Sequence, residues 1–149
     1  MKKINIILCC FLFVTLMLFV GEGAAQSQPI SQSDLPDLKG KWKGERSFMT
    51  GGHRPNTDLE ISNDTLPLEC KLILYDVQQR GGGTGGRGGA TRTETREFKA
   101  KINEKGNLYS KWGNFEMELS LYRSDGKMKL EGDFYMAGAR GTISVKKKN

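Results

Sequence analysis

The sequence predicts an all-β fold of about eight antiparallel strands, connected as an up-and-down meander that closes, or nearly closes, into a small barrel. Three observations support this prediction. Apolar residues recur at every second position within short segments, as expected for strands with one buried face. Turn-forming residues separate these segments, and no segment has a convincing helical periodicity. A two-sheet β-sandwich remains the alternative, because the same strands could pair in two layers.

The alternation begins around Trp42. Apolar residues and glycines share one parity there, while Lys39, Lys41 and Lys43 occupy the other, so Trp42 is predicted to be buried. The same pattern returns after each of the next two turns. The predicted inward positions are Leu38, Gly40, Trp42, Gly44 and Phe48, then Leu59 and Ile61, then Leu66, Leu68, Cys70, Leu72 and Leu74.

The second half of the domain repeats the pattern. Its strongest turn signal is Asp125-Gly126, since both central residues of a type I′ hairpin turn need positive φ. A meander removes its exposed strand edges by closing on itself, which favours the barrel. The predicted inward positions are Phe98, Ala100 and Ile102, then Leu108 and Trp112, then Phe115, Met117, Leu119 and Leu121, then Met128, Leu130, Phe134 and Met136, then Gly141, Ile143 and Val145.

Residues 1–25 are typical of a secretory signal peptide. Lys2 and Lys3 precede an apolar run, and small residues follow it up to Ala25, so cleavage is expected before Gln26. An uncleaved membrane anchor is the alternative, because the run approaches the roughly 20 residues that span a bilayer. A cleaved chain would be secreted, periplasmic or otherwise extracytoplasmic.

The remaining chain is predicted to hold one domain. Residues 26–37 are polar and carry two prolines, which indicates a flexible leader. Residues 38–147 form the predicted barrel, interrupted at 78–92 by a glycine-rich segment that we expect to be a mobile loop. The Arg-Gly-Gly runs of this loop also occur in RNA-binding proteins, but a nucleic-acid partner is disfavoured for an exported chain.

The net charge and the cysteine count indicate which partners are favoured and what must stabilise the domain. The whole chain has a net charge of +6, and removing residues 1–25 takes away two lysines and Glu22, which leaves +5. Cys70 is then the only cysteine, so the domain must be stabilised by its core and not by an internal disulfide. A basic chain favours acidic partners, although scattered lysines are also typical of a solvated surface.

The sequence offers little catalytic chemistry. The only histidine, His53, lies in a predicted turn and has no recognisable partners for nucleophilic catalysis. One histidine and one inward cysteine are too few for a zinc site. Six glutamates lie opposite the apolar parity and are expected to face outward; they are Glu45, Glu69, Glu97, Glu116, Glu118 and Glu131. We therefore predict a noncatalytic protein with no metal and no cofactor.

The motif Gly40-Lys41-Trp42 resembles the Gly-x-Trp signature of lipocalins and their calycin relatives, which include avidin-type barrels. In that family the tryptophan closes one end of the barrel, and a basic residue on or near the last strand packs across its ring. Arg140 matches the basic residue by position, so the resemblance implies that Arg140 stacks on Trp42. The lipocalin disulfides are absent, and the biotin-binding residues of avidins have no counterparts that can be matched here.

Two functional hypotheses follow. The first is a noncatalytic barrel that binds a small apolar or amphiphilic molecule, since eight strands can enclose one small ligand or be filled by side chains. The predicted ligand-lining residues are Trp112, Phe115, Met117, Phe134 and Met136. The second is a cell-envelope module that binds an acidic polymer or a protein through its outer face. The residues that would contribute are Lys39, Lys41, Lys43, Lys71, Lys99 and Lys101, with Arg80 and Arg87 of the loop.

Overall fold

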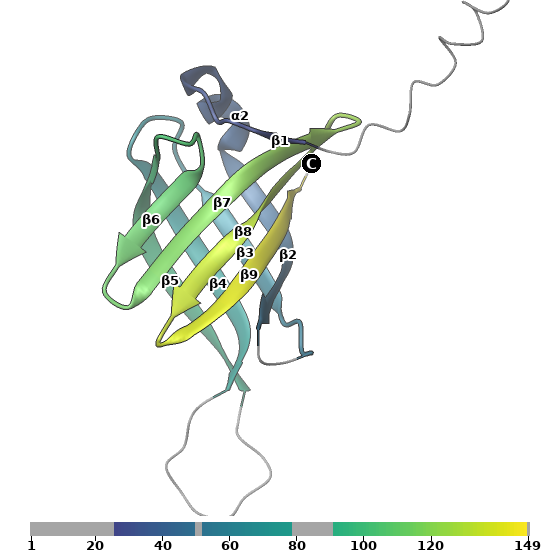
Figure 1. The fold of residues 1–149 in the computed structure, drawn as a ribbon, viewed down its shortest axis with the longest axis vertical. Helices are drawn as coiled ribbons and strands as arrows, with labels where there is room; N and C mark the ends of the chain where they lie inside the picture. The colour runs from purple at the N-terminus through teal and green to yellow at the C-terminus, as the bar shows by residue number, and fades with distance from the viewer. Residues whose placement is uncertain (1–25, 50–51, 79–90, 149) are drawn as a thin grey trace, which may run out of the picture.

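The computed structural model describes residues 26–49, 52–78 and 91–148. In these residues eight antiparallel strands close into a barrel (Figure 1). The strands are β2 (Gly40–Phe48), β3 (Asn56–Ile61), β4 (Leu68–Gln78), β5 (Thr91–Ile102), β6 (Leu108–Trp112), β7 (Phe115–Ser124), β8 (Lys127–Met136) and β9 (Ala139–Lys147). Before them lie the short strand β1 (Ser27–Gln28), the 3-10 helix η1 (Gln32–Asp34) and the one-turn helix α2 (Leu35–Leu38).

The barrel strands pair in chain order, and the ring closes between the first and the last of them. β9 pairs with β2 from Trp42 opposite Lys147 to Phe48 opposite Gly141. The predicted closed meander is therefore confirmed, and the sandwich alternative is excluded. The Asp125-Gly126 turn has φ of 50° and 71°, as the type I′ prediction requires.

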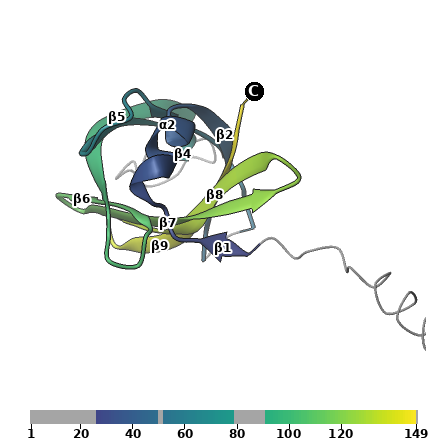
Figure 2. The ribbon, with the colours of Figure 1, turned by 90° about the horizontal axis from the view of Figure 1, so that it is seen from above.

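The structure corrects the prediction that residues 26–37 are a flexible leader. Ser27–Gln28 pairs with β7 at Leu121 and Tyr122, beyond the stretch of β7 that pairs with the shorter β6. Ile30 and Leu35 are both buried. In Figure 2, which looks along the barrel, α2 lies within the ring of strands. The fold therefore begins before residue 38, and its N-terminal segment closes one end of the barrel, which we call the α2 end.

Two predicted segments lie wholly or largely outside the described residues. The predicted signal peptide, residues 1–25, lies outside the described residues, as does most of the predicted loop at 78–92. In the part of the chain that the structure describes, no helix is both long enough and apolar enough to cross a membrane.

The interior of the barrel is one apolar cluster that runs from the α2 end towards the opposite end. Trp42, Leu59, Leu72, Met117 and Leu130 are among its members without solvent exposure. These residues lie on the parity that the sequence predicts to face inward.

Gly132 permits a close approach of neighbouring strands, so its replacement tests the wall of the barrel. A Cβ atom built on Gly132 would lie 2.0 Å from the carbonyl oxygen of Glu118 on β7. We expect Gly132→Ala to destabilise the fold by about 1–3 kcal/mol, because the backbone must shift to admit the methyl group. Gly52→Ala is the control, since its Cβ would meet no atom within 4 Å. Equal unfolding midpoints in denaturant for the two variants would contradict this packing.

Candidate functional site

Five aromatic side chains gather inside the barrel at the end opposite α2, and we call this set the aromatic end. They come from β2, β5, β6, β7 and β8, and they are Phe48, Phe98, Trp112, Phe115 and Phe134. In Figure 1 the β6–β7 and β8–β9 turns mark this end of the barrel.

The rings pack directly against one another. Trp112 is sandwiched between Phe98 and Phe115, with ring centroids 4.4 and 4.0 Å away and near-parallel planes. The ring centroid of Phe134 lies 6.3 Å from that of Phe115 and 5.2 Å from that of Phe48, which it meets edge to face. Such offset and edge contacts are the favourable geometries for aromatic pairs. The rings therefore cover much of one another's surface, and part of the surface of Phe48, Phe98 and Trp112 stays exposed for a ligand.

The five residues predicted to line a ligand site occupy neighbouring positions in the structure. Trp112 is paired with Phe115, which is paired in turn with Met136, and Met117 is paired with Phe134. Phe115, Met117 and Phe134 are buried, whereas Trp112 and Met136 are half-buried. A molecule that approaches from this end would meet Trp112 and Met136 before the three buried side chains.

Charged side chains lie next to the aromatic end on β5. The Arg96 guanidinium lies over the Phe115 ring, 5.9 Å from its centroid. It also pairs with Glu94 at 2.5 Å, and Arg92 reaches the same carboxylate at 3.9 Å. Two arginines thus share one glutamate, which leaves an excess of positive charge beside the rings.

A third arginine, Arg46, is buried in the wall of the barrel near the same end, with only 2% of its surface exposed. It donates hydrogen bonds to the carbonyl oxygens of Asn56 and Tyr75 at 3.0 and 2.5 Å and to the Thr57 hydroxyl at 3.2 Å. Its Nε atom has no hydrogen-bond partner among the residues that the structure describes.

No carboxylate of the described residues lies within 4.0 Å of the Arg46 guanidinium, so its positive charge is not directly neutralised. Burial lowers the pKa of Arg46 from its usual value, against the attraction of Asp76 and Glu94. An arginine remains protonated even so. Arg46 therefore adds to the positive charge of this end.

Neither Arg46 nor Arg96 is among the residues that the sequence singled out, although a signal was present. Arg46 shares the parity of Trp42 and Phe48, and Arg96 shares the parity of Phe98. A charged residue on the apolar parity of a strand is a sign of an inward-facing polar group.

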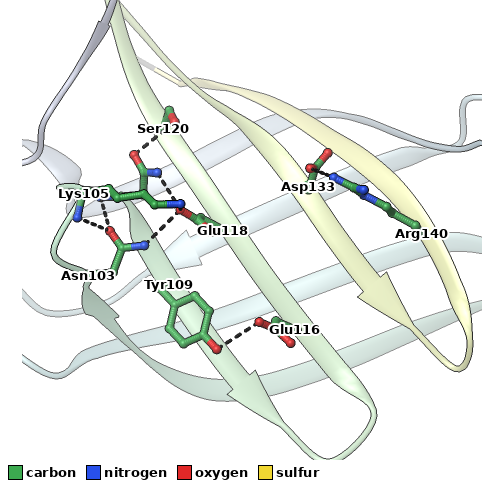
Figure 3. Close-up of polar contacts among 9 residues, drawn as sticks. Asn103, Lys105, Tyr109, Glu116, Glu118, Ser120, Asp133 and Arg140 are labelled. Carbon is green, nitrogen blue, oxygen red and sulfur yellow. Dashed lines mark hydrogen bonds and ion pairs between the residues drawn. The ribbon is translucent and has the colours of Figure 1, made fainter.

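The predicted contact between Arg140 and Trp42 is wrong. Trp42 is buried at the α2 end, where its indole Nε1 donates a hydrogen bond to the carbonyl oxygen of Leu38 at 2.9 Å. The cation near the indole is Lys147, whose Nζ lies 6.0 Å from the ring centroid. Arg140 lies at the other end of β9 and pairs with Asp133 on the outer face (Figure 3).

The physical reason is the pairing of the two closing strands. Because β2 and β9 are antiparallel, the start of β2 meets the end of β9, and Trp42 faces Lys147. Arg140, which lies near the beginning of β9, is therefore distant from the tryptophan.

Lys147 and Arg140 are expected to contribute differently to the stability of the fold. Lys147→Ala is expected to destabilise the fold by about 0.5–1 kcal/mol, through the loss of its interaction with the indole. Arg140→Ala is expected to have a smaller effect, because its ion pair with Asp133 is exposed to solvent. Thermal unfolding of both variants checks the order, and a larger loss for Arg140→Ala would contradict it.

The outer face of β6 and β7 carries a network of carboxylates with partners (Figure 3). Hydrogen bonds from Asn107 and Asn103 lower the pKa of Glu118. The pKa of Glu116 is lowered by Lys111 and then by the Tyr109 hydroxyl. Both carboxylates are therefore held in the ionised form, whereas a general acid would need a raised pKa.

Within the described part of the chain, neither His53 nor Cys70 lies in an arrangement that would make it reactive. His53 is exposed, whereas Cys70 is buried and its pKa is raised to about 12 by desolvation. Its thiol is therefore protonated near neutral pH. The described residues contain no group of three or more His, Cys, Asp or Glu side chains that could hold a metal ion.

Comparisons with protein-family models, with curated proteins and with solved structures find no match for this chain.

Proposed function

We propose that this protein is a noncatalytic barrel that binds an amphiphilic molecule with an acidic head group at its aromatic end. The observation that carries the proposal is the juxtaposition of half-buried Trp112 and Met136 with the arginines of β5. The apolar part of the ligand would contact the rings and Met136, and its anionic head would contact Arg96 and Arg92. Ligand sites of this kind combine apolar walls with a few polar groups that fix orientation.

The packing of the rings limits the mode of binding. Since Phe115, Met117 and Phe134 are already buried against their neighbours, the ligand would lie on the aromatic end and not deep in the barrel. The closed barrel is compatible with a lipocalin-like architecture, and we propose kinship with that family on this basis.

Titration calorimetry with two detergent-like probes tests the proposal. Dodecanoate and dodecyltrimethylammonium have tails of equal length and opposite head-group charges, and both are used below the concentrations at which they form micelles. We expect dodecanoate to bind at least about tenfold more tightly, because the arginines outnumber Glu94. Equal affinities, a preference for the cation, or no binding of either probe would contradict the proposal.

We also propose that the protein is exported and cleaved before Gln26, on the basis of the basic, apolar and small-residue order of residues 1–25. The mass of the protein recovered outside the cytoplasm tests this directly. A chain that begins at Gln26 is expected, and a chain that retains Met1 would exclude cleavage.

A further inference from the structure

Three lysines lie side by side in one row across the outer face of the barrel, near the α2 end. Lys146 on β9 is paired directly with Lys43 on β2 and with Lys129 on β8. All three occupy the parity opposite the core, so their side chains share one surface. Like charges placed directly opposite each other destabilise a sheet.

The two outer lysines of the row have acidic partners, and the central one has none among the described residues. Lys43 lies 3.7 Å from Asp58, and Lys129 lies 2.8 Å from Glu131. Within the described part of the chain, no carboxylate comes within 4.0 Å of the exposed Lys146. The uncompensated charge is therefore concentrated at the middle of the row.

Lys146 also lines a hollow of about 210 Å³ between β9 and the β7–β8 hairpin. The lining side chains include three ammonium groups, two hydroxyls and a single carboxylate, and one of the ammonium groups, that of Lys129, is already paired with Glu131. These groups belong to Lys127, Lys129, Lys146, Tyr122, Ser124 and Asp125, and Met128 completes the lining. The hollow is too small for a drug-sized ligand, whose pockets are about 300–1,000 Å³. It is large enough for one phosphate or sulfate group.

We propose that this hollow, the lysine hollow, binds a phosphate or sulfate group of an anionic polymer. A polymer is favoured over a free ion because exposed lysines continue along the α2 end beyond the hollow. Lys41 and Lys148 are both exposed, and they are joined by a backbone hydrogen bond of 2.8 Å from the Lys148 amide to the Lys41 carbonyl oxygen. The site is separate from the aromatic end and does not depend on its function.

Binding of heparin, a sulfated polysaccharide, and of inorganic polyphosphate tests the proposal at two salt concentrations, with inorganic sulfate and phosphate as monomeric probes. We expect at least one polymer to bind, with an affinity that falls steeply as salt rises. The free ions should compete only weakly. Binding of neither polymer at low salt would overturn the proposal, and free ions that bind as tightly as the polymers would overturn the polymer assignment.

Charge reversal locates the site. Lys146→Glu is expected to weaken polymer binding at least tenfold, whereas Lys99→Glu makes the same change of charge at an exposed position on β5 and should weaken it less than threefold. Equal losses for both variants would indicate a general charge effect and overturn the assignment to the hollow.

Thermal stability provides an independent readout. Because Lys146→Glu relieves the repulsion within the row, its unfolding temperature should be equal to or higher than that of the wild type. A loss of polymer binding in this variant would then not be caused by unfolding. If Lys146→Glu unfolds at a lower temperature, Lys146→Gln replaces it, and that variant must still bind more weakly than Lys99→Gln for the proposal to stand.

Discussion

Trp42→Ala is expected to lower the free energy of unfolding by about 3–5 kcal/mol, as large-to-small changes of buried aromatic residues do. Trp42 has no solvent exposure, and it joins the wall of the barrel to the segment that closes the α2 end. Its removal leaves a cavity beneath Leu38 and deprives the Leu38 carbonyl oxygen of the indole hydrogen bond. Denaturant unfolding with a matched wild-type curve measures the loss.

Trp42→Phe is the matched control, because it keeps an aromatic ring and removes the hydrogen bond. We expect this variant to lose less than half of what Trp42→Ala loses. A cost below about 1 kcal/mol for Trp42→Ala would mean that the α2 end is not closed as described.

Arg96→Glu is expected to weaken dodecanoate binding at least tenfold, which corresponds to about 1.4 kcal/mol. The substitution places a second carboxylate beside Glu94, at the position where the acidic head is proposed to bind. It also removes the cation over the Phe115 ring. Titration calorimetry of the variant and the wild type under identical salt conditions gives the ratio of affinities.

Lys99→Glu is the matched control for this prediction as well, since it makes the same change of charge on the same strand but at an exposed position on the opposite parity. Its affinity for dodecanoate should stay within about threefold of the wild type. Arg96→Gln, which is less disruptive to the fold, should also lower the affinity, by a smaller factor than Arg96→Glu. Equal losses in Arg96→Glu and Lys99→Glu would contradict a local role for Arg96.

The barrel itself was predictable because each strand has one face inside. Period-two alternation therefore marks the inward residues of nearly every strand, and Asp125-Gly126 marks a hairpin independently. The N-terminal segment was not predictable in this way. Ile30 and Leu35 become buried by docking on the barrel, which leaves no periodic pattern in a short polar stretch.

The candidate site was predictable only in part. Parity shows that Trp112, Phe115 and Phe134 face inward, but it does not show which inward side chains meet, because that depends on how the strands are staggered around the barrel. Phe48 and Phe98 join the cluster for this reason. The error over Arg140 has a different cause, because the antiparallel pairing of β2 with β9 places Lys147 and not Arg140 opposite Trp42.

The most direct test of the proposed function is the fluorescence of Trp112 in the Trp42→Phe variant, where Trp112 is the only remaining tryptophan. Trp112 is half-buried at the aromatic end, so an apolar tail that binds there should cover its exposed part. We predict a saturable blue shift of its emission as dodecanoate is added below the micellar concentration, and a much weaker response to dodecyltrimethylammonium. An emission spectrum that does not change while calorimetry records dodecanoate binding would contradict the account, because the ligand would then lie elsewhere on the protein.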